Sequence, residues 1–391
     1  MIYRVAVIVL ILLISGCESG NSSVMVASVS SDGQYAVSAH RDNQIILWDI
    51  EGQTSKSVSD NANIYSAYFV HGSSVFIWQD LSGLVSIEKI TENGATKALR
   101  QFEAKDSYGQ VMSSDLETHV YSDKQWRLMK GQEKLKWDGD SPGFLGIGKI
   151  LNLSISPDGS RLVSFGDGSP PEQEIEASPG DAVDHERRMS RYAGTVIWDL
   201  NSVEPVAKLP GNSAKTNGTI SPDGNYVVSV DENAKGFVWD ARTGEEEYRL
   251  ANLRFGKYIG GHDAGSAENW DDSGNHLEWP GDFPGEFRGG SKLAVKFVSD
   301  SEFVVFHTYS HYVTFYQLGD PHARKVLDLG SRPHPSTGAY LRNASIASAP
   351  EAGILVTGQQ NGNGINVYQF DEETKELEKI WTPRRRSWWP F

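Results

Sequence analysis

The chain has 391 residues and a formal charge of −15, with 51 acidic residues against 36 basic ones. Phosphate backbones are tracked by clustered Lys and Arg, so a nucleic acid is not an expected partner of so acidic a chain. Cys17 is the only cysteine, which excludes a disulfide and a cysteine nucleophile from the folded part.

The first residues predict an export signal. Arg4 precedes the apolar run Val5–Ile14, which is too short for a bilayer core that needs about 20 helical residues. Its length is that of the apolar region of a secretory signal. The next residues, ISGC at positions 14–17, resemble a bacterial lipobox, which implies cleavage after residue 16 and acylation of Cys17. An ordinary secretory signal with an incidental cysteine is the alternative.

Residues 17–23 are expected to be a lipidated tether. About seven extended residues reach at most ~25 Å, so the folded part would lie close to the membrane. Glu18 follows the cysteine, whereas an Asp at this position resembles an inner-membrane retention signal. We therefore expect the periplasmic side of the outer membrane rather than the inner membrane.

A repeat begins directly after this tether. Val29–Ile50 reads as a turn, an alternating strand, a second turn and a strand that ends in Trp-Asp. The same order returns at Ile155–Leu200 and at Thr219–Ala241, and Trp198 and Trp239 are 41 residues apart. Periods of about 40–45 residues are typical of propeller blades.

These repeats resemble those of the WD-repeat β-propeller family, in which each repeat supplies one blade. The resemblance implies an all-β fold over residues 24–382: a seven-bladed β-propeller of four-stranded antiparallel blades. Trp239 and Tyr316 are nearly two periods apart, so eight blades is the alternative. Four weaker repeats keep the same rhythm, and in the last two Tyr316 and Tyr368 replace the Trp: Ser66–Ile90, Gln110–Met129, Leu293–Leu318 and Ala344–Phe370.

The resemblance also implies a hydrogen-bonded set of a strand Ser, a turn Asp and the Trp indole. Ser38 and Asp42 lie ten and six residues before Trp48, and the same spacing recurs in the fifth repeat. A buried indole N–H needs an acceptor, so we expect structural rather than catalytic roles, and none for His40. The remaining members of the structural set are Ser164, Trp198, Asp199, Ser229, Asn233, Trp239 and Asp240.

Two insertions interrupt the rhythm, near residues 166–193 and 252–290. The second provides candidate partner-binding residues, namely Trp270, Asp271, Asp272 and Trp279. Its segment Asn269–Gly274 has the oxygen spacing of a calcium loop, but Pro280 stands where a bidentate Glu is required. We therefore expect no metal or cofactor, with calcium at this turn as a weaker alternative.

The tail, residues 383–391, combines three arginines with two tryptophans. Trp at headgroup level and Arg against anionic lipid are typical of an interfacial membrane contact. Packing of the tryptophans between the first and last blades is the alternative. Arg384, Arg385, Trp388 and Trp389 are the candidate contact residues.

The chain contains no motif of a serine hydrolase, a zinc protease or a P-loop enzyme. His307 and His311 are two imidazoles, whereas a catalytic zinc site usually needs three protein ligands. The sequence favours a non-catalytic scaffold of the cell envelope that binds other proteins, as a monomer or within a hetero-complex. A glycan-binding protein or hydrolase that uses the insert 260–290 is the alternative.

Overall fold

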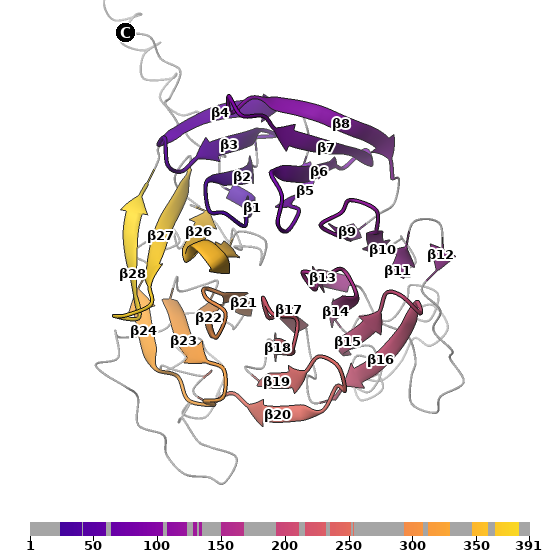
Figure 1. Cartoon of the computed structure of the whole chain (residues 1–391), viewed down its shortest axis with the longest axis vertical. Coiled ribbons are helices and arrows are strands. Elements are labelled where there is room, and N and C mark those ends of the chain that lie inside the picture. Colours follow the sequence, from indigo (N-terminus) through magenta and orange to yellow (C-terminus); the bar gives the residue numbers. More distant parts are fainter. Residues whose placement is uncertain are drawn as a thin grey trace, which may run out of the picture.

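The computed structural model arranges its strands in seven four-stranded antiparallel sheets around a central axis (Figure 1). It is a seven-bladed β-propeller, as expected, and the described strands form no eighth blade. The structure describes residues 24–40, 42–59, 64–104, 108–122, 128–130, 133–134, 150–167, 193–210, 216–231, 235–251, 253, 293–307, 312–328, 346–358 and 364–382.

Each blade consists of four consecutive strands, the first nearest the axis and the fourth at the rim. Blades 1 to 3 comprise β1 (Val24–Val29), β2 (Tyr35–His40), β3 (Ile45–Asp49), β4 (Thr54–Ser59), β5 (Ile64–Phe69), β6 (Val75–Asp80), β7 (Leu84–Ile90), β8 (Thr96–Glu103), β9 (Tyr108–Met112), β10 (His119–Ser122), β11 (Leu128–Lys130) and β12 (Glu133–Lys134). Blades 4 and 5 comprise β13 (Ile150–Ile155), β14 (Arg161–Asp167), β15 (Ala193–Asp199), β16 (Glu204–Leu209), β17 (Thr216–Ile220), β18 (Tyr226–Asp231), β19 (Gly236–Asp240) and β20 (Glu246–Arg249). Blades 6 and 7 comprise β21 (Leu293–Phe297), β22 (Glu302–His307), β23 (Tyr312–Gln317), β24 (Lys325–Asp328), β25 (Ile346–Ala349), a 3-10 turn η3 (Pro350–Ala352), β26 (Ile354–Gly358), β27 (Ile365–Asp371) and β28 (Glu376–Trp381).

The middle strands form the core because neighbouring blades cover both of their faces. β18 (YVVSVD) and β19 (GFVWD) are therefore almost continuously buried, as expected for a strand without a solvent face. The fourth strands lie at the rim, and β4 (TSKSVS) is correspondingly polar and largely exposed. Hydrophobic clusters lie between adjacent blades, so blade-to-blade packing stabilises the ring.

The ring has two different faces. The turn face carries two sets of short turns. The inner turns join the first strand of each blade to the second, and the outer turns join the third strand to the fourth. The connection face carries the links between the second and third strands and those between blades. The segments 168–192 and 254–292 leave and re-enter the sheets on the connection face, where β1 begins and β28 ends.

Among the described residues, side-chain packing joins blades 1 and 7 and closes the ring. A buried cluster joins β1–β3 to β25–β27, and the rings of Trp48 and Trp381 meet edge to face with centroids 6.2 Å apart. The inner turn of blade 1 fits closely at this junction, because a Cβ on Gly33 would lie 2.7 Å from Ala352 Cβ. Each described blade is built from one uninterrupted run of four strands, so blades 1 and 7 share no strand.

Five blades carry a β-bulge in the rim strand. In blades 1, 2, 4, 5 and 7 one residue of the fourth strand has no partner in the third. A bulge twists an edge strand and discourages its pairing with another chain. The rim is therefore protected against edge-to-edge association. The bulged residues are Val58, Leu99, Val206, Glu247 and Ile380.

In the described part of the chain, no helix has the length and apolar character that crossing a membrane requires.

Candidate binding face

The inner turns of four blades repeat one hydrogen-bonded design. In blade 5 the Ser221 hydroxyl donates to Asp223 Oδ1 at 2.5 Å and accepts the Tyr226 N–H at 2.9 Å. Asp223 Oδ1 also accepts the Asn225 N–H at 3.0 Å. The following Gly224 has φ +75°, a conformation that side chains with a Cβ rarely adopt. The equivalent Ser–Asp pairs are Ser30–Asp32, Ser113–Asp115 and Ser156–Asp158.

In the turns of blades 3, 4 and 5 these hydrogen bonds hold the carboxylate in its ionised form. The Ser156 hydroxyl is the main cause of the lowered pKa of Asp158, and the Ser113 hydroxyl lowers the pKa of Asp115. Burial opposes ionisation of Asp223, but donors from Ser221 and Asn225 outweigh it and the pKa is lowered. A carboxylate that accepts several hydrogen bonds is stabilised as the anion. The inner turns therefore carry fixed negative charges.

The Asp of each Trp-Asp pair closes an outer turn. Asp199 Oδ1 accepts the N–H groups of Asn201 and Ser202, and Asp49 Oδ1 accepts that of Gly52 at 2.7 Å. Asp240 is bonded in the same way to Arg242 and Thr243. A short acidic side chain after a strand satisfies the backbone of the tight turn that follows. The backbone N–H of Thr243 is the main cause of the lowered pKa of Asp240.

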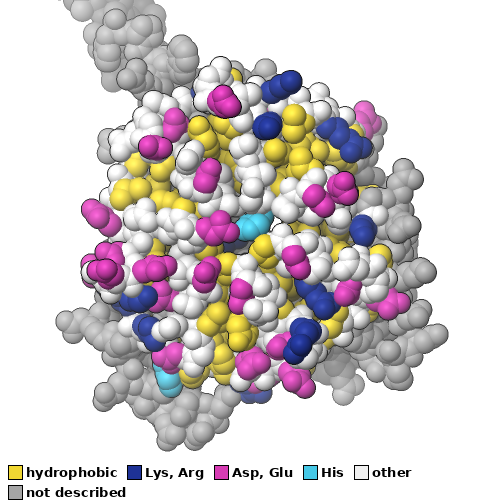
Figure 2. All heavy atoms as spheres, in the orientation of Figure 1, with side chains coloured by type: hydrophobic (Ala, Val, Ile, Leu, Met, Phe, Trp, Pro, Cys, Tyr) yellow, Lys and Arg dark blue, Asp and Glu magenta, His cyan; other side chains and the backbone are white. Residues whose placement is uncertain are grey.

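The turn face is consequently acidic. Six of the seven inner turns contain Asp or Glu, none contains Lys or Arg, and the turn of blade 2 contributes His71. Figure 2 shows this face, with Asp and Glu side chains spread around the ring. His71 lies close to the inner turns of blades 1 and 7: its Nδ1 is 3.3 Å from Ser31 Oγ and its Nε2 is 3.8 Å from Glu351 Oε1.

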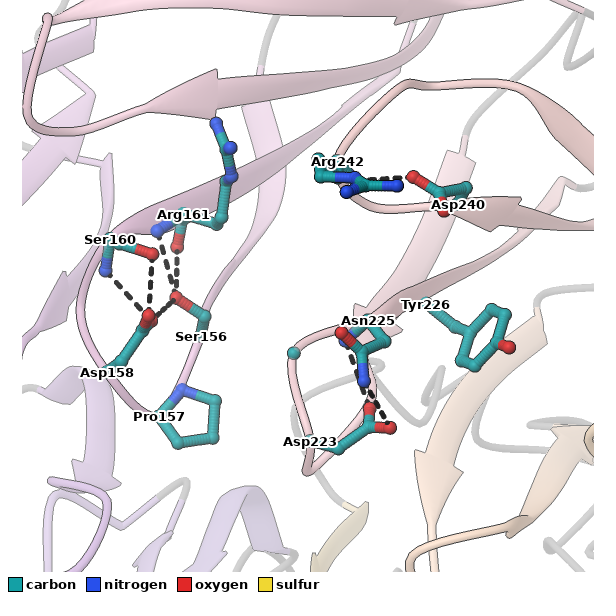
Figure 3. A pocket seen from close by; sticks show the side chains of 11 residues that line it. Ser156, Pro157, Asp158, Ser160, Arg161, Asp223, Asn225, Tyr226, Asp240 and Arg242 are labelled. Atoms are coloured by element: carbon teal, nitrogen blue, oxygen red, sulfur yellow. Dashed lines mark hydrogen bonds between the residues drawn. The ribbon is translucent and has the colours of Figure 1, made fainter.

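A hollow of about 570 Å³ opens on this face between blades 4 and 5 (Figure 3). Asp158 and Asp223 from the two inner turns line it, together with Asp240 from an outer turn. The Arg161 guanidinium, at its other side, lies 2.9 Å from Asp199 Oδ2, so its charge is already balanced. Pro157 and Tyr226 add apolar surface. Arg242 also lines the hollow, and its charge contributes to the lowered pKa of Asp240. Asp158 and Asp223 are therefore the ionised carboxylates that suit the hollow to a cationic side chain.

The predicted Trp–Ser contacts lie inside the blades, away from this face. The indole N–H of Trp48 donates to Ser38 Oγ at 2.7 Å, and Trp198 and Trp239 donate to Ser164 and Ser229 at 2.9 Å. All three indoles are buried. Each bond ties a third strand to the second strand of the same blade. Asp42 lies half-buried in the turn after β2, while Asn233 lies outside the described residues.

The expectation that His40 takes no part was wrong. His40 is buried at the end of β2, and its Nε2 lies 2.8 Å from Ser38 Oγ. It faces the Trp48 ring at a centroid distance of 6.4 Å. The spacing of two residues from Ser38 places both side chains on the same side of the strand, and this was the signal in the sequence.

Two blades without a Trp on the third strand differ at these positions. Tyr316 occupies the Trp position of blade 6, and its hydroxyl donates to the Ala251 carbonyl at 2.7 Å, which ties blade 6 to blade 5. In blade 2 neither residue is kept: Trp78 lies at the position of the strand Ser and Glu88 at that of the Trp. The buried indole N–H of Trp78 has no hydrogen-bond partner among the described residues. The buried Glu88 accepts a hydrogen bond from Ser86 at 2.7 Å.

Several predicted functional residues lie outside the described residues, and they stay predictions. The list comprises Cys17, the calcium-like turn 269–274, Trp270, Asp271, Asp272, Trp279, Arg384, Arg385, Trp388 and Trp389. Within the described part, no three His, Cys, Asp or Glu side chains gather as a metal-binding group would.

Comparison with known proteins agrees with the fold. The chain has the architecture of a seven-bladed propeller. A model of the family described as WD domain, G-beta repeat, matches residues 12–49, which include the Ser38–Trp48 pair of blade 1. The match and the ring of seven blades together support the WD-repeat propeller family. No curated protein matches the chain.

Proposed function

We propose that this chain is a protein-interaction scaffold of the cell envelope, held at the periplasmic side of the outer membrane by a lipid on Cys17. The observation that carries the scaffold proposal is the array of rigid acidic turns on one face of a WD-repeat-like ring. Such a surface suits recognition of other proteins, because its charges keep their positions before and after binding. The sequence ISGC before residue 18 supports the anchor.

The partner is a protein with a basic segment that seats at the hollow between blades 4 and 5. Ionised Asp158 and Asp223 attract Lys or Arg, and complementary charge mainly increases the rate and selectivity of association. The insertions leave from the opposite face, so they offer a second, independent binding region. The basic aromatic tail, residues 383–391, would meet the lipid surface.

Crosslinking in intact envelopes followed by recovery of the lipidated protein tests the scaffold. The double variant Asp158→Asn/Asp223→Asn keeps oxygen acceptors for the turn N–H groups but removes two charges. We expect it to recover much less partner at low salt. Glu372→Gln/Glu373→Gln, on the exposed outer turn of blade 7, is the matched control and should recover as much as the unaltered chain. Equal recovery from all three proteins would contradict the proposed face.

Fractionation tests the anchor separately. Cys17→Ser removes the thiol that the lipid requires, so the protein should move from the membrane fraction to the soluble periplasmic fraction. Its melting temperature, measured on the purified protein, should stay unchanged. Retention of the Cys17→Ser protein in the outer membrane would contradict the proposed anchor. It would not bear on the proposed binding face, which the crosslinking experiment tests separately.

A further inference from the structure

The carboxylate in the inner turn of blade 5 is already used by its own turn. Asp223 Oδ1 accepts the Ser221 hydroxyl at 2.5 Å and the Asn225 N–H at 3.0 Å, and Asp223 Oδ2 accepts Asn225 Nδ2 at 2.8 Å. A carboxylate has about four lone-pair sites on its two oxygens. Within the described part of the chain three of these sites are occupied, and the open one belongs to Oδ2.

Blade 4 repeats this arrangement at Asp158. Its Oδ1 accepts the Ser156 hydroxyl at 2.5 Å and the Ser160 N–H at 3.0 Å, and its Oδ2 accepts the Ser160 hydroxyl at 2.8 Å. Figure 3 shows the carboxylates of Asp158 and Asp223 bonded to donors of their own turns. The two turns are in contact, because a Cβ on Gly224 would lie 3.7 Å from Ser156 Cβ. Each turn thus offers a ligand the same single oxygen, Oδ2.

The other two Ser–Asp turns saturate the same oxygen. In blade 1, Asp32 Oδ1 accepts the Ser30 hydroxyl at 2.6 Å and the Gln34 N–H at 3.0 Å. In blade 3, Asp115 Oδ1 likewise accepts a hydroxyl and a backbone N–H of its own turn. Saturation of Oδ1 is therefore a property of the repeated turn design and not of one blade.

This saturation affects arginine and lysine ligands differently. Arginine binds a carboxylate most strongly through two parallel N–H···O bonds, which need a free lone pair on both oxygens. A carboxylate whose Oδ1 is saturated cannot accept this pair. A lysine ammonium group is a compact charge whose donors rotate, so it can give single bonds to oxygens of different carboxylates. The inner turns therefore remove the main advantage of arginine and keep that of lysine.

The hollow between blades 4 and 5 provides room for a long side chain. Asp158 and Asp223 line this hollow of about 570 Å³, and Pro157 and Tyr226 add apolar surface. Lysine methylenes pack along apolar surface while the ammonium group stays among polar groups. Stacking on Tyr226 is open to both cations, so it does not decide between them.

We propose that the turn face selects lysine over arginine, and that a lysine ammonium group of the partner seats in the hollow lined by Asp158 and Asp223. This inference rests on the proposed scaffold function and names the side chain that its acidic face selects. The preference is moderate, because both carboxylates are exposed and water and salt screen charges at the surface.

Fluorescence anisotropy of labelled peptides, titrated with the full chain at low salt, tests the selectivity. The probes are synthetic peptides in which glycine alternates with lysine, with arginine or with acetyl-lysine. We expect the lysine peptide to bind about threefold more tightly than the arginine peptide, as an exposed ion pair allows. The acetyl-lysine peptide lacks the charge and should bind much more weakly than both.

Two variants show whether the preference arises at the hollow. Asp158→Asn/Asp223→Asn removes both charges, so both charged peptides should bind more weakly and the lysine preference should disappear. Glu372→Gln/Glu373→Gln removes the same number of charges from the exposed outer turn of blade 7 and should keep the preference. Circular dichroism of both variants checks that the fold is kept.

The outcomes separate this inference from the proposed function. Suppose that the arginine peptide binds as tightly as the lysine peptide or more tightly, and that Asp158→Asn/Asp223→Asn loses the binding of both. The lysine preference would then be overturned, while the acidic face would remain a site for basic segments. A preference that persists in the double variant would overturn the assignment to the hollow. Absence of binding by both charged peptides would contradict the proposed function as well.

Discussion

The turn face and the connection face are joined to the same strands but differ in how regular their connections are. The inner turns of the turn face repeat one Ser–Asp design in four blades, in which the Ser hydroxyl donates to the Asp carboxylate. The connection face carries both long insertions and receives both ends of the ring. One face has little freedom in length or composition, while the other accepts additional residues without changing a strand pairing. Substitutions should therefore cost most on the turn face.

The largest effect is expected where the turn face meets the junction of blades 1 and 7. Gly33→Ala combines a φ of +71° with a Cβ that would lie 2.8 Å from Ile354 Cγ1. We expect a loss of about 3 kcal/mol in unfolding free energy from strain and overpacking. Gly72→Ala is the control, since φ is +66° but nothing lies within 4 Å, and it should lose only about 1 kcal/mol. Urea unfolding of both variants checks this, and equal losses would contradict it.

An acid-sensitive step is expected beneath the inner turn of blade 3. Burial, and secondarily Arg100, lowers the pKa of His119 from 6.5 to about 4, and its Nε2 lies 2.9 Å from Gln110 Oε1. The unfolded chain therefore binds a proton that the folded chain does not. Stability present above pH 6.5 should fall by about 2 kcal/mol as the pH drops to about 4. His119→Gln should reduce the dependence of unfolding free energy on pH, measured by denaturant titrations. An unchanged dependence would mean that another group causes it.

A smaller loss is expected from one turn hydroxyl. Ser221→Ala removes the donor to Asp223 and leaves the Tyr226 N–H without its acceptor. The expected cost is about 1–2 kcal/mol, typical of an unsatisfied buried group. Ser301→Ala, at an exposed position in the inner turn of blade 6, should change the melting temperature very little. If the Ser221→Ala protein had the same melting temperature as the unaltered chain, the turn design would contribute no stability.

The smallest effect is expected on the connection face. Asp167 and Ala193 are paired directly across β14 and β15, so an Asn-Gly turn can replace residues 168–192. Loop length changes stability only slowly, by about 0.6 kcal/mol for each doubling, and we expect a change within about 1 kcal/mol. Calorimetry of the shortened protein measures it. A loss of several kcal/mol would mean that the two faces do not differ as described.

The repeat pattern was sufficient to predict the blades, because the alternation of apolar residues and the turn signals are local. It also predicted that Ser38 and Trp48 belong together, ten residues apart on neighbouring strands. It could not place the Tyr316 hydroxyl on the Ala251 carbonyl, because that contact joins blade 6 to blade 5 and exists only when the ring is closed. The pattern also gave no indication that Trp78 lies at the strand Ser position of blade 2, where its indole N–H has no hydrogen-bond partner among the described residues.

The uninterrupted construction of each blade has a consequence for the order of the chain. Because no strand is shared between blades 1 and 7, a circular permutant that joins residue 382 to residue 24 and opens between blades 4 and 5 would keep every ladder hydrogen bond. It would only move the covalent gap to a different pair of neighbours. The position of the chain termini is thus independent of the architecture. Selection could adjust the attachment point of the ring without altering a single blade.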